Sequence, residues 1–242
     1  MRAVILAKYH FASLWNWRTS YLGRFIEPIA YLLFLSASLQ SSLSDQVDQY
    51  GTFVLTGLAC LLSFRAATAS MSDVANDRKW GVFAMYVLQG GSAKGYLLSI
   101  LMFTSAVYLL QFLLLAVSAY IVLPGAMPSA PSILMIAGVG LLFVLGWSAL
   151  GAAVGGRVDS YATRDLLVTV TTLPVILAAP IFVPLDGSWV RYVAAINPLT
   201  YQVQMLRNPS WLVLLAAILW SCVASIVAVS ILKSADRVSR ER

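Results

Sequence analysis

The sequence predicts an all-α integral membrane protein with six transmembrane helices in a single domain over residues 1–242. Hydrophobic residues make up 60% of the 242 residues and charged residues only 11%, whereas a soluble domain carries about 25% charged residues. The mean hydropathy is +0.82. Six apolar runs lie along the chain, and most reach the roughly 20 residues that a helix needs to cross a bilayer.

Residues 1–23 mix cations with several Trp and Tyr side chains, a combination that favours the headgroup layer. Val4, Ala7, Phe11, Leu14 and Trp15 share one helical face. We therefore expect an interfacial helix on the cytoplasmic surface, and the alternative is a frayed tail. No compact apolar core followed by a cleavage site is present, so a signal peptide is not expected.

The apolar runs predict the transmembrane spans. The first run is short and has Glu27-Pro28 near its start, and the fifth contains three prolines, which kink a helix. The third is long enough to tilt or to protrude. The expected spans are about 25–40, 53–71, 96–123, 133–154, 166–185 and 211–232.

Small residues in these runs are expected to serve packing. Gly151 and Gly155 form a GxxxG pattern in the fourth span, which is typical of helices in close contact. Cys60 and Cys222 both fall within apolar runs, so we interpret them as packing residues and not as a disulfide or a metal pair.

The distribution of cations predicts the orientation. With the amino terminus in the cytoplasm, 13 of the 16 Lys and Arg residues lie on the cytoplasmic side, as the positive-inside rule requires. Both termini and residues 72–95 are then cytoplasmic, while Asp45, Asp48 and Asp186 face outward. The same rule explains the net charge of +6 without a nucleic-acid partner.

A short apolar helix is predicted between the second and third spans. Its seven consecutive apolar residues would extend only about 10 Å at about 1.5 Å per residue. They are apolar on every face, so burial on more than one side is needed, and the membrane part can cover one side only. A partner is expected to cover the other side, and the alternative is a segment that lies in the headgroup layer. The residues expected to contact the partner are Val82, Phe83, Met85, Tyr86 and Leu88, preceded by the charges Asp77, Arg78 and Lys79.

A helical hairpin is predicted between the fifth and sixth spans. The semi-apolar segment 189–196 is followed by Asn197-Pro198 and then by 199–207. Asn before Pro is typical of a helix cap with proline at the first helical position. Neither piece is long enough to span, so we expect a hairpin that dips back into the outer leaflet. The alternative is a loop lying flat on the headgroups.

Arg65 lies inside the second apolar run, and Glu27 lies near the cytoplasmic end of the first. A central arginine costs about 2.5–3.5 kcal/mol on insertion scales, so a functional role is the default interpretation. An internal ion pair between Arg65 and Glu27 is the alternative.

Motifs of enzymes are missing from the sequence. No GxxxxGK[ST] occurs, and 89–94 has only a superficial glycine–lysine likeness to it. The single histidine, His10, lies in the amino-terminal segment, and no group of residues has metal-ligand spacing. No inverted repeat is evident, which weakens a secondary-transporter interpretation. No enzyme is predicted.

Taken together, these residues resemble the permease subunits of type-2 ABC exporters over the whole chain. One marker of this resemblance is the charged segment that ends in 78–81 and precedes the short apolar helix, where Asp77 stands in for the usual glutamate of that loop. Another is the set Arg24, Pro28 and Tyr31 at the start of the first span. The most specific marker is the run Asn197, Pro198, Leu199, Thr200 and Tyr201 together with Arg207.

The resemblance implies a transmembrane subunit in the bacterial inner membrane that pairs with a second permease copy as a homodimer. Each copy would bind a separate ABC ATPase beneath residues 72–95, and ATP and Mg would belong to that partner, with no cofactor in this chain. ATP-driven closure would switch the pair between inward-open and outward-open states. A drug-like, lipid-linked or glycan substrate would be exported, as in multidrug resistance. Arg65, Glu27 and Tyr31 are the candidates for the translocation path.

A non-transporting accessory or scaffold subunit is the competing class. A scaffold has no need of a short, wholly apolar cytoplasmic helix, so that helix discriminates between the two. An ion-coupled carrier should place several carboxylates in mid-membrane, and the apolar runs contain none there.

Overall fold

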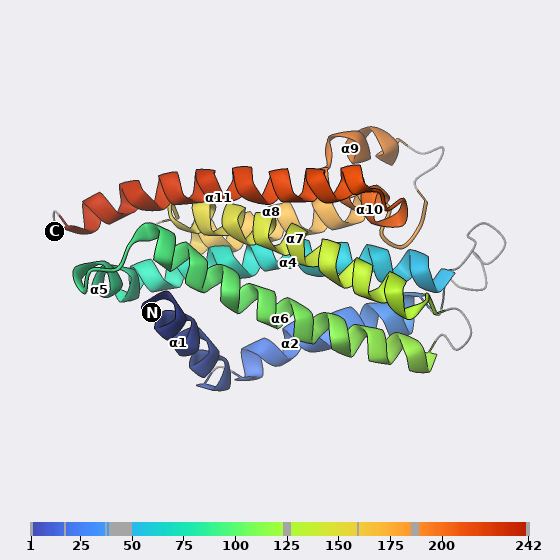
Figure 1. Cartoon of the computed structure of the whole chain (residues 1–242), viewed down its shortest axis with the longest axis horizontal. Helices are drawn as coiled ribbons and strands as arrows, with labels where there is room; N and C mark the ends of the chain where they lie inside the picture. Colours follow the sequence, from blue (N-terminus) through green and yellow to red (C-terminus); the bar gives the residue numbers. More distant parts are fainter. Residues whose placement is uncertain are drawn as a thin grey trace.

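The computed structural model describes residues 2–16, 18–36, 38, 50–122, 127–158, 160–184 and 189–240, and within these ranges it contains helices and no strand (Figure 1). The helices are α1 (Arg2–Asn16), α2 (Arg18–Ala30), the π-helical η1 (Tyr31–Ser36), α4 (Tyr50–Lys79), α5 (Val82–Leu88), α6 (Ala93–Val122), α7 (Ala130–Gly155), α8 (Tyr161–Leu177), α9 (Val190–Ile196), α10 (Pro198–Arg207) and α11 (Trp211–Arg240).

Four of the described helices are long and apolar enough to cross a membrane. They cover Tyr50–Lys79, Ala93–Val122, Ala130–Gly155 and Trp211–Ser234, and they match the second, third, fourth and sixth predicted spans. Their outward side chains are apolar, as on Leu113 of α6 and Leu219 of α11, which are 59% and 64% exposed. These surfaces suit contact with lipid.

The first and fifth predicted spans differ from the structure. α2 and η1 begin at Arg18, earlier than expected, and the residues that follow Ser38 lie outside the described part of the chain. The fifth span was predicted as helical to residue 185, but α8 ends at Leu177 and residues 178–184 are not helical. Pro174 lies inside α8 and lacks an N–H, which weakens the helix around it. The six-span topology therefore stays a prediction.

α4 runs through the middle of the bundle and packs most closely on α7. A Cβ added to Gly151 would collide with the backbone of Ala67, and one added to Gly155 would collide with the backbone of Met71. These glycines let the two helix backbones approach each other, so the GxxxG prediction is confirmed.

α1 packs on α6 through Leu6, Ala7 and His10, which are its buried residues. Only Ala7 belongs to the predicted apolar face; Val4 and Trp15 are exposed at 43% and 74%. Phe11 of the same face makes an edge contact with Phe103 of α6, with 5.2 Å between the ring centroids, so the predicted face lies only partly against the bundle.

The short elements lie at the two ends of the bundle. α1 begins beside Gly90, and both α1 and the carboxyl end of α11 lie at the end that carries α5 (Figure 1). α9 and α10 lie at the opposite end (Figure 1). The predicted short helix and the two helices of the predicted hairpin are present, with bounds within one residue of those expected. That the hairpin dips into the outer leaflet stays a prediction. Asp45, Asp48 and Asp186, predicted to face outward, lie outside the described residues.

Candidate functional site

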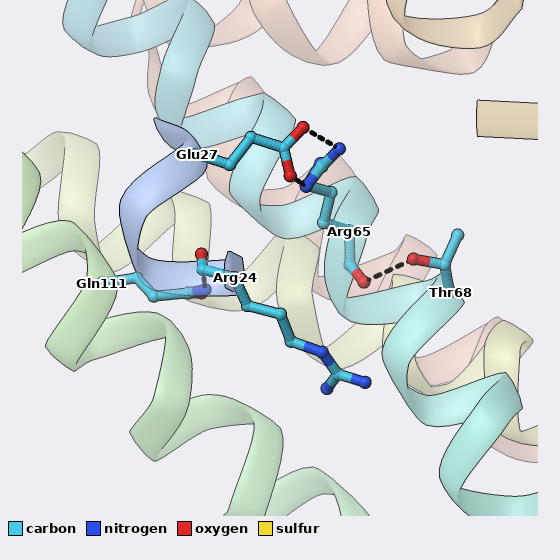
Figure 2. Close-up of polar contacts among 5 residues, drawn as sticks. All are labelled: Arg24, Glu27, Arg65, Thr68 and Gln111. Carbon is cyan, nitrogen blue, oxygen red and sulfur yellow. Dashed lines mark hydrogen bonds and ion pairs between the residues drawn. The ribbon is translucent and has the colours of Figure 1, made fainter. Parts of the chain in front are cut away.

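Arg65 of α4 and Glu27 of α2 form an ion pair inside the bundle (Figure 2). Both terminal nitrogens of the Arg65 guanidinium donate to the two carboxylate oxygens of Glu27. The Arg65 and Glu27 side chains are 26% and 36% exposed. A two-point contact of this kind fixes the relative position of the two helices, and it is the internal pairing that the sequence left open.

A cavity of about 240 Å³ lies next to this ion pair, between α2, α4, α6 and α8. Its lining includes the polar side chains of Arg24, Arg65, Thr68, Tyr108, Gln111 and Thr172. Gln111 donates to the backbone carbonyl of Arg24 at 2.9 Å, and Thr68 donates to that of Arg65 at 2.9 Å (Figure 2). Polar side chains from four helices therefore converge on one space within the bundle.

Tyr31, the third residue predicted for the translocation path, lies one helical turn beyond Glu27. Its ring packs against Phe182, with 5.6 Å between the ring centroids, and it does not line this cavity. The Tyr31 side chain also hydrogen-bonds that of Glu27. The structure thus brings all three predicted residues together, and the Tyr31 ring in addition contacts the non-helical segment after α8.

The short helix α5 divides into a buried side and an exposed side. Gly81 and Gly90 flank it with positive φ angles of 76° and 80°, which glycine adopts at little cost. Phe83 is 1% exposed and makes an edge contact with Tyr96 at 4.8 Å between ring centroids. Met85 and Leu88 are 61% and 73% exposed. The exposed apolar side is available to a partner.

Val82 and Tyr86 are half-buried on the flanks of α5. The three charged residues before α5 lie in different surroundings. Asp77 is buried and accepts a hydrogen bond from the hydroxyl of Tyr96 at 2.7 Å. The ammonium of Lys79 lies 3.6 Å from the centroid of the Tyr161 ring, a cation–π contact, and Arg78 is half-buried.

Asn197 joins the hairpin to the broken end of α8. Its side-chain oxygen accepts from the N–H of Leu199 at 3.0 Å, and Pro198 opens α10, as the cap prediction requires. Its side-chain amide donates to the carbonyl of Val175 at 2.7 Å, and Thr200 donates to that of Ala178 at 3.4 Å.

Arg207, at the other end of α10, contacts the non-helical segment after α8 and the first turn of α4. Its guanidinium donates to the carbonyls of Ile181 at 3.1 Å and Phe53 at 3.2 Å, and lies 3.4 Å from the centroid of the Phe53 ring. Burial lowers the pKa of this guanidinium to about 10, which leaves it charged at neutral pH. Leu199 is buried, and the exposed Tyr201 donates to the carbonyl of Ala195.

Two side-chain contacts between distant segments were not predicted from the sequence. His10 of α1 lies 3.7 Å from Asp77, between its Nε2 and the Oδ2 of the carboxylate. The indole N–H of Trp147 on α7 donates to the side-chain oxygen of Gln202 on α10 at 2.6 Å. Gln202 is buried, but the sequence shows only a glutamine within an amphipathic helix, which does not reveal its partner.

The described part of the chain contains four helices long and apolar enough to cross a membrane, with short helices at the two ends of the bundle, which is the architecture of a multi-pass membrane protein. Residues 2–211 match the family of ABC-2 type transporters, and the chain belongs to this family.

Two similar proteins both carry the name "Putative transport permease ycf38". The protein of Porphyra purpurea is 24% identical over 213 residues, which are 83% of this chain and 72% of the relative. The protein of Cyanophora paradoxa is 21% identical over 219 residues, which are 86% of this chain and 75% of the relative. ABC-2 permeases are in general non-catalytic membrane subunits that act with an ABC ATPase.

Proposed function

We propose that this chain is the transmembrane subunit of an ATP-driven exporter in a bacterial inner membrane, with both termini in the cytoplasm. Two copies form a homodimer, and each copy binds one ATPase subunit, which holds ATP and Mg. ATP-driven closure of the ATPases shifts the pair between inward-open and outward-open states by differential binding. A drug-like, lipid-linked or glycan substrate leaves the cytoplasm along a path beside Arg65, Glu27 and Tyr31.

The exposed side of α5 is the observation that carries this proposal. Met85 and Leu88 expose apolar side chains at an end of the bundle where charged residues are frequent. Full burial of such a side chain in a partner groove is worth roughly 1.5–3 kcal/mol, so the pair is a credible centre for a small interface. The buried side of α5 links that interface to Tyr96 and hence to α6.

The proposal is tested by pull-down of the partner ATPase with the full chain in membranes. Met85→Asp and Leu88→Asp are expected to reduce the recovered ATPase at least about tenfold, because a charge at the interface core loses more than about 1.4 kcal/mol. Gln89→Asp is the matched control, because Gln89 is exposed next to α5 but outside its apolar side. Phe83→Asp is unsuitable, because Phe83 is buried within this chain and its loss would disturb the bundle itself.

Two results would count against the proposal. Recovery of no ATPase with the unmodified chain would favour the accessory or scaffold class. Full recovery and full transport with both variants would mean that α5 is a segment of the headgroup layer and does not couple the two subunits.

A further inference from the structure

A larger cavity, of about 760 Å³, lies at the end of the bundle that carries α5. Its walls come from α1, α2, the last turns of α4, the first residue of α5 and the start of α8. The volume falls within the roughly 300–1,000 Å³ of small-molecule sites. Arg24 and Ser72 line both this cavity and the one beside Arg65, so the two spaces adjoin each other.

Buried polar atoms without partners line this cavity. His10 is 8% exposed, and its Nε2 has no hydrogen-bond partner among the described residues. The distance of 3.7 Å from this atom to Asp77 is too long for a hydrogen bond. The Oδ2 of Asp73 is likewise buried and has no partner within the described part of the chain. Because buried polar atoms are nearly always hydrogen-bonded, these two acceptors indicate a missing donor.

The unpartnered acceptors of Asp73 and His10, next to the Asp77 carboxylate, suit an ammonium group as that donor. Burial lowers the pKa of the His10 imidazole to about 4, so His10 is uncharged at neutral pH and its Nε2 can accept a hydrogen bond. Three carboxylates and two guanidinium groups line the cavity. The carboxylates are those of Asp73, Asp77 and Asp165, and the guanidinium groups are those of Arg24 and Arg164.

The Arg164 guanidinium already has partners on its own side of the cavity. It donates to Asp165 at 2.8 Å and to the side-chain oxygen of Asn76 at 2.9 Å, and it lies over the Tyr161 ring at 4.9 Å. This cluster of contacts disfavours an anionic ligand at Arg164.

Aromatic side chains form another part of the wall. Tyr9 and Trp80 line the cavity and are 69% and 57% exposed. The faces of such rings attract cations and also cover apolar groups. In this same cavity Tyr161 already has the ammonium of Lys79 at 3.6 Å from its ring centroid.

We propose that this cavity binds a protonated amine with an aromatic body. The ammonium group donates to Asp73 and to Nε2 of His10, close to the Asp77 carboxylate, and the aromatic body lies against Tyr9 and Trp80. The inference rests on the proposed export function in one respect: if the chain is an exporter, this amine is the substrate taken up on the cytoplasmic side. Binding itself needs no ATPase.

The test uses the full chain, purified in dodecyl maltoside so that no amine-bearing lipid is supplied, and fluorescence titration at neutral pH. Three probes share one ring system: naphthylmethylamine is cationic, naphthylmethanol is neutral and naphthoate is anionic. We expect the dissociation constant of the amine to be at least about tenfold lower than that of the alcohol, because a charge-assisted hydrogen bond strengthens binding by about that much.

Isosteric variants locate the site. Asp73→Asn and Asp77→Asn are each expected to weaken amine binding about tenfold or more and to leave binding of the alcohol unchanged. Asp165→Asn is expected to weaken amine binding less than either of these variants, because its side chain is 66% exposed and already paired with Arg164. Melting temperatures identify any variant that fails to fold, and the other variant then decides.

Equal binding of the amine and the alcohol, preference for naphthoate, or unchanged amine affinity in the folded variants would overturn the inference. A failed ATPase pull-down with intact amine binding would instead overturn the proposed export function alone.

Discussion

The side-chain amide of Asn197 donates a hydrogen bond of 2.7 Å to the backbone carbonyl of Val175, 22 residues earlier in the chain. The regular helical partner of that carbonyl would be the N–H of Ala179, which instead lies 3.3 Å from the carbonyl of Ile176. Asn197 therefore supplies a donor where α8 breaks. In the interior of a membrane protein, little water is available to donate a hydrogen bond to such a carbonyl. The contact with Asn197 therefore stabilises the non-helical segment.

Two substitutions of Asn197 separate its two roles. Asn197→Asp keeps the oxygen that caps α10 but loses the donor to Val175, whereas Asn197→Ala loses both. A lost cap costs about 1 kcal/mol, and a buried carbonyl without a partner costs about 1–3 kcal/mol. We expect the melting temperature to fall in the order wild type, Asn197→Asp, Asn197→Ala. Equal values for all three proteins would show that neither contact stabilises the fold.

The ion pair between Arg65 and Glu27 predicts a compensating pair of substitutions. Arg65→Ala leaves the Glu27 carboxylate without its partner, at a cost of about 1–3 kcal/mol. If the pair only joins α2 to α4, the double variant Arg65→Ala with Glu27→Ala should recover stability and transport. If Arg65 also contributes to the path beside the cavity, stability should recover and transport should not. Thermal denaturation and a transport assay on the same four proteins distinguish these results.

Full transport by Arg65→Ala alone would contradict both interpretations. The cavity next to Arg65 makes that outcome unexpected, because the substitution would enlarge a space that is now about 240 Å³.

The orientation of the chain is tested with single cysteines at Gln89, after α5, and at Tyr192, in α9, which are both exposed. The background is Cys60→Ala with Cys222→Ala. An impermeant thiol reagent is expected to label position 192 in intact cells and position 89 only after permeabilisation, because most cations lie on the α5 side. Labelling of position 89 in intact cells would reverse the assigned orientation.

Local signals explain what the sequence predicted well. The bounds of α5 follow from its flanking glycines and charges, and the start of α10 follows from Asn197-Pro198. Each of these signals acts through neighbouring residues, so no knowledge of the rest of the fold is needed. Four spanning helices follow equally from the length of their apolar runs.

Contacts between distant segments explain what the sequence could not predict. The early end of α8 depends on donors from residues 197–207, which the apolar pattern of 166–185 does not reveal. The side of α1 that packs on α6 was not evident from the sequence, because exposed residues such as Trp15 are as apolar as packed ones. Hydrophobicity alone therefore does not separate the two faces of a helix in a membrane. The approach of His10 to Asp77 likewise joins two segments far apart in sequence.

Substitutions of two glycines in α7 test the close contact between α7 and α4. A methyl group at Gly151 would overlap the carbonyl of Ala67, which is backbone and cannot turn aside, whereas a methyl group at Gly138 would meet no atom within 4 Å. Gly151→Ala should therefore force α4 and α7 apart and cost about 1–3 kcal/mol, as overpacking of a core does.

Gly138→Ala makes the same chemical change in the same helix and should leave stability unchanged or slightly higher, because alanine favours the helix. For a chain of this size, each kcal/mol changes the melting temperature by about 2–4 °C, so the two variants should differ measurably. Gly155→Ala provides a second case, because its methyl group would overlap the backbone of Met71. If Gly151→Ala and Gly155→Ala melted at the same temperature as Gly138→Ala, the glycines would not be what holds α4 and α7 together.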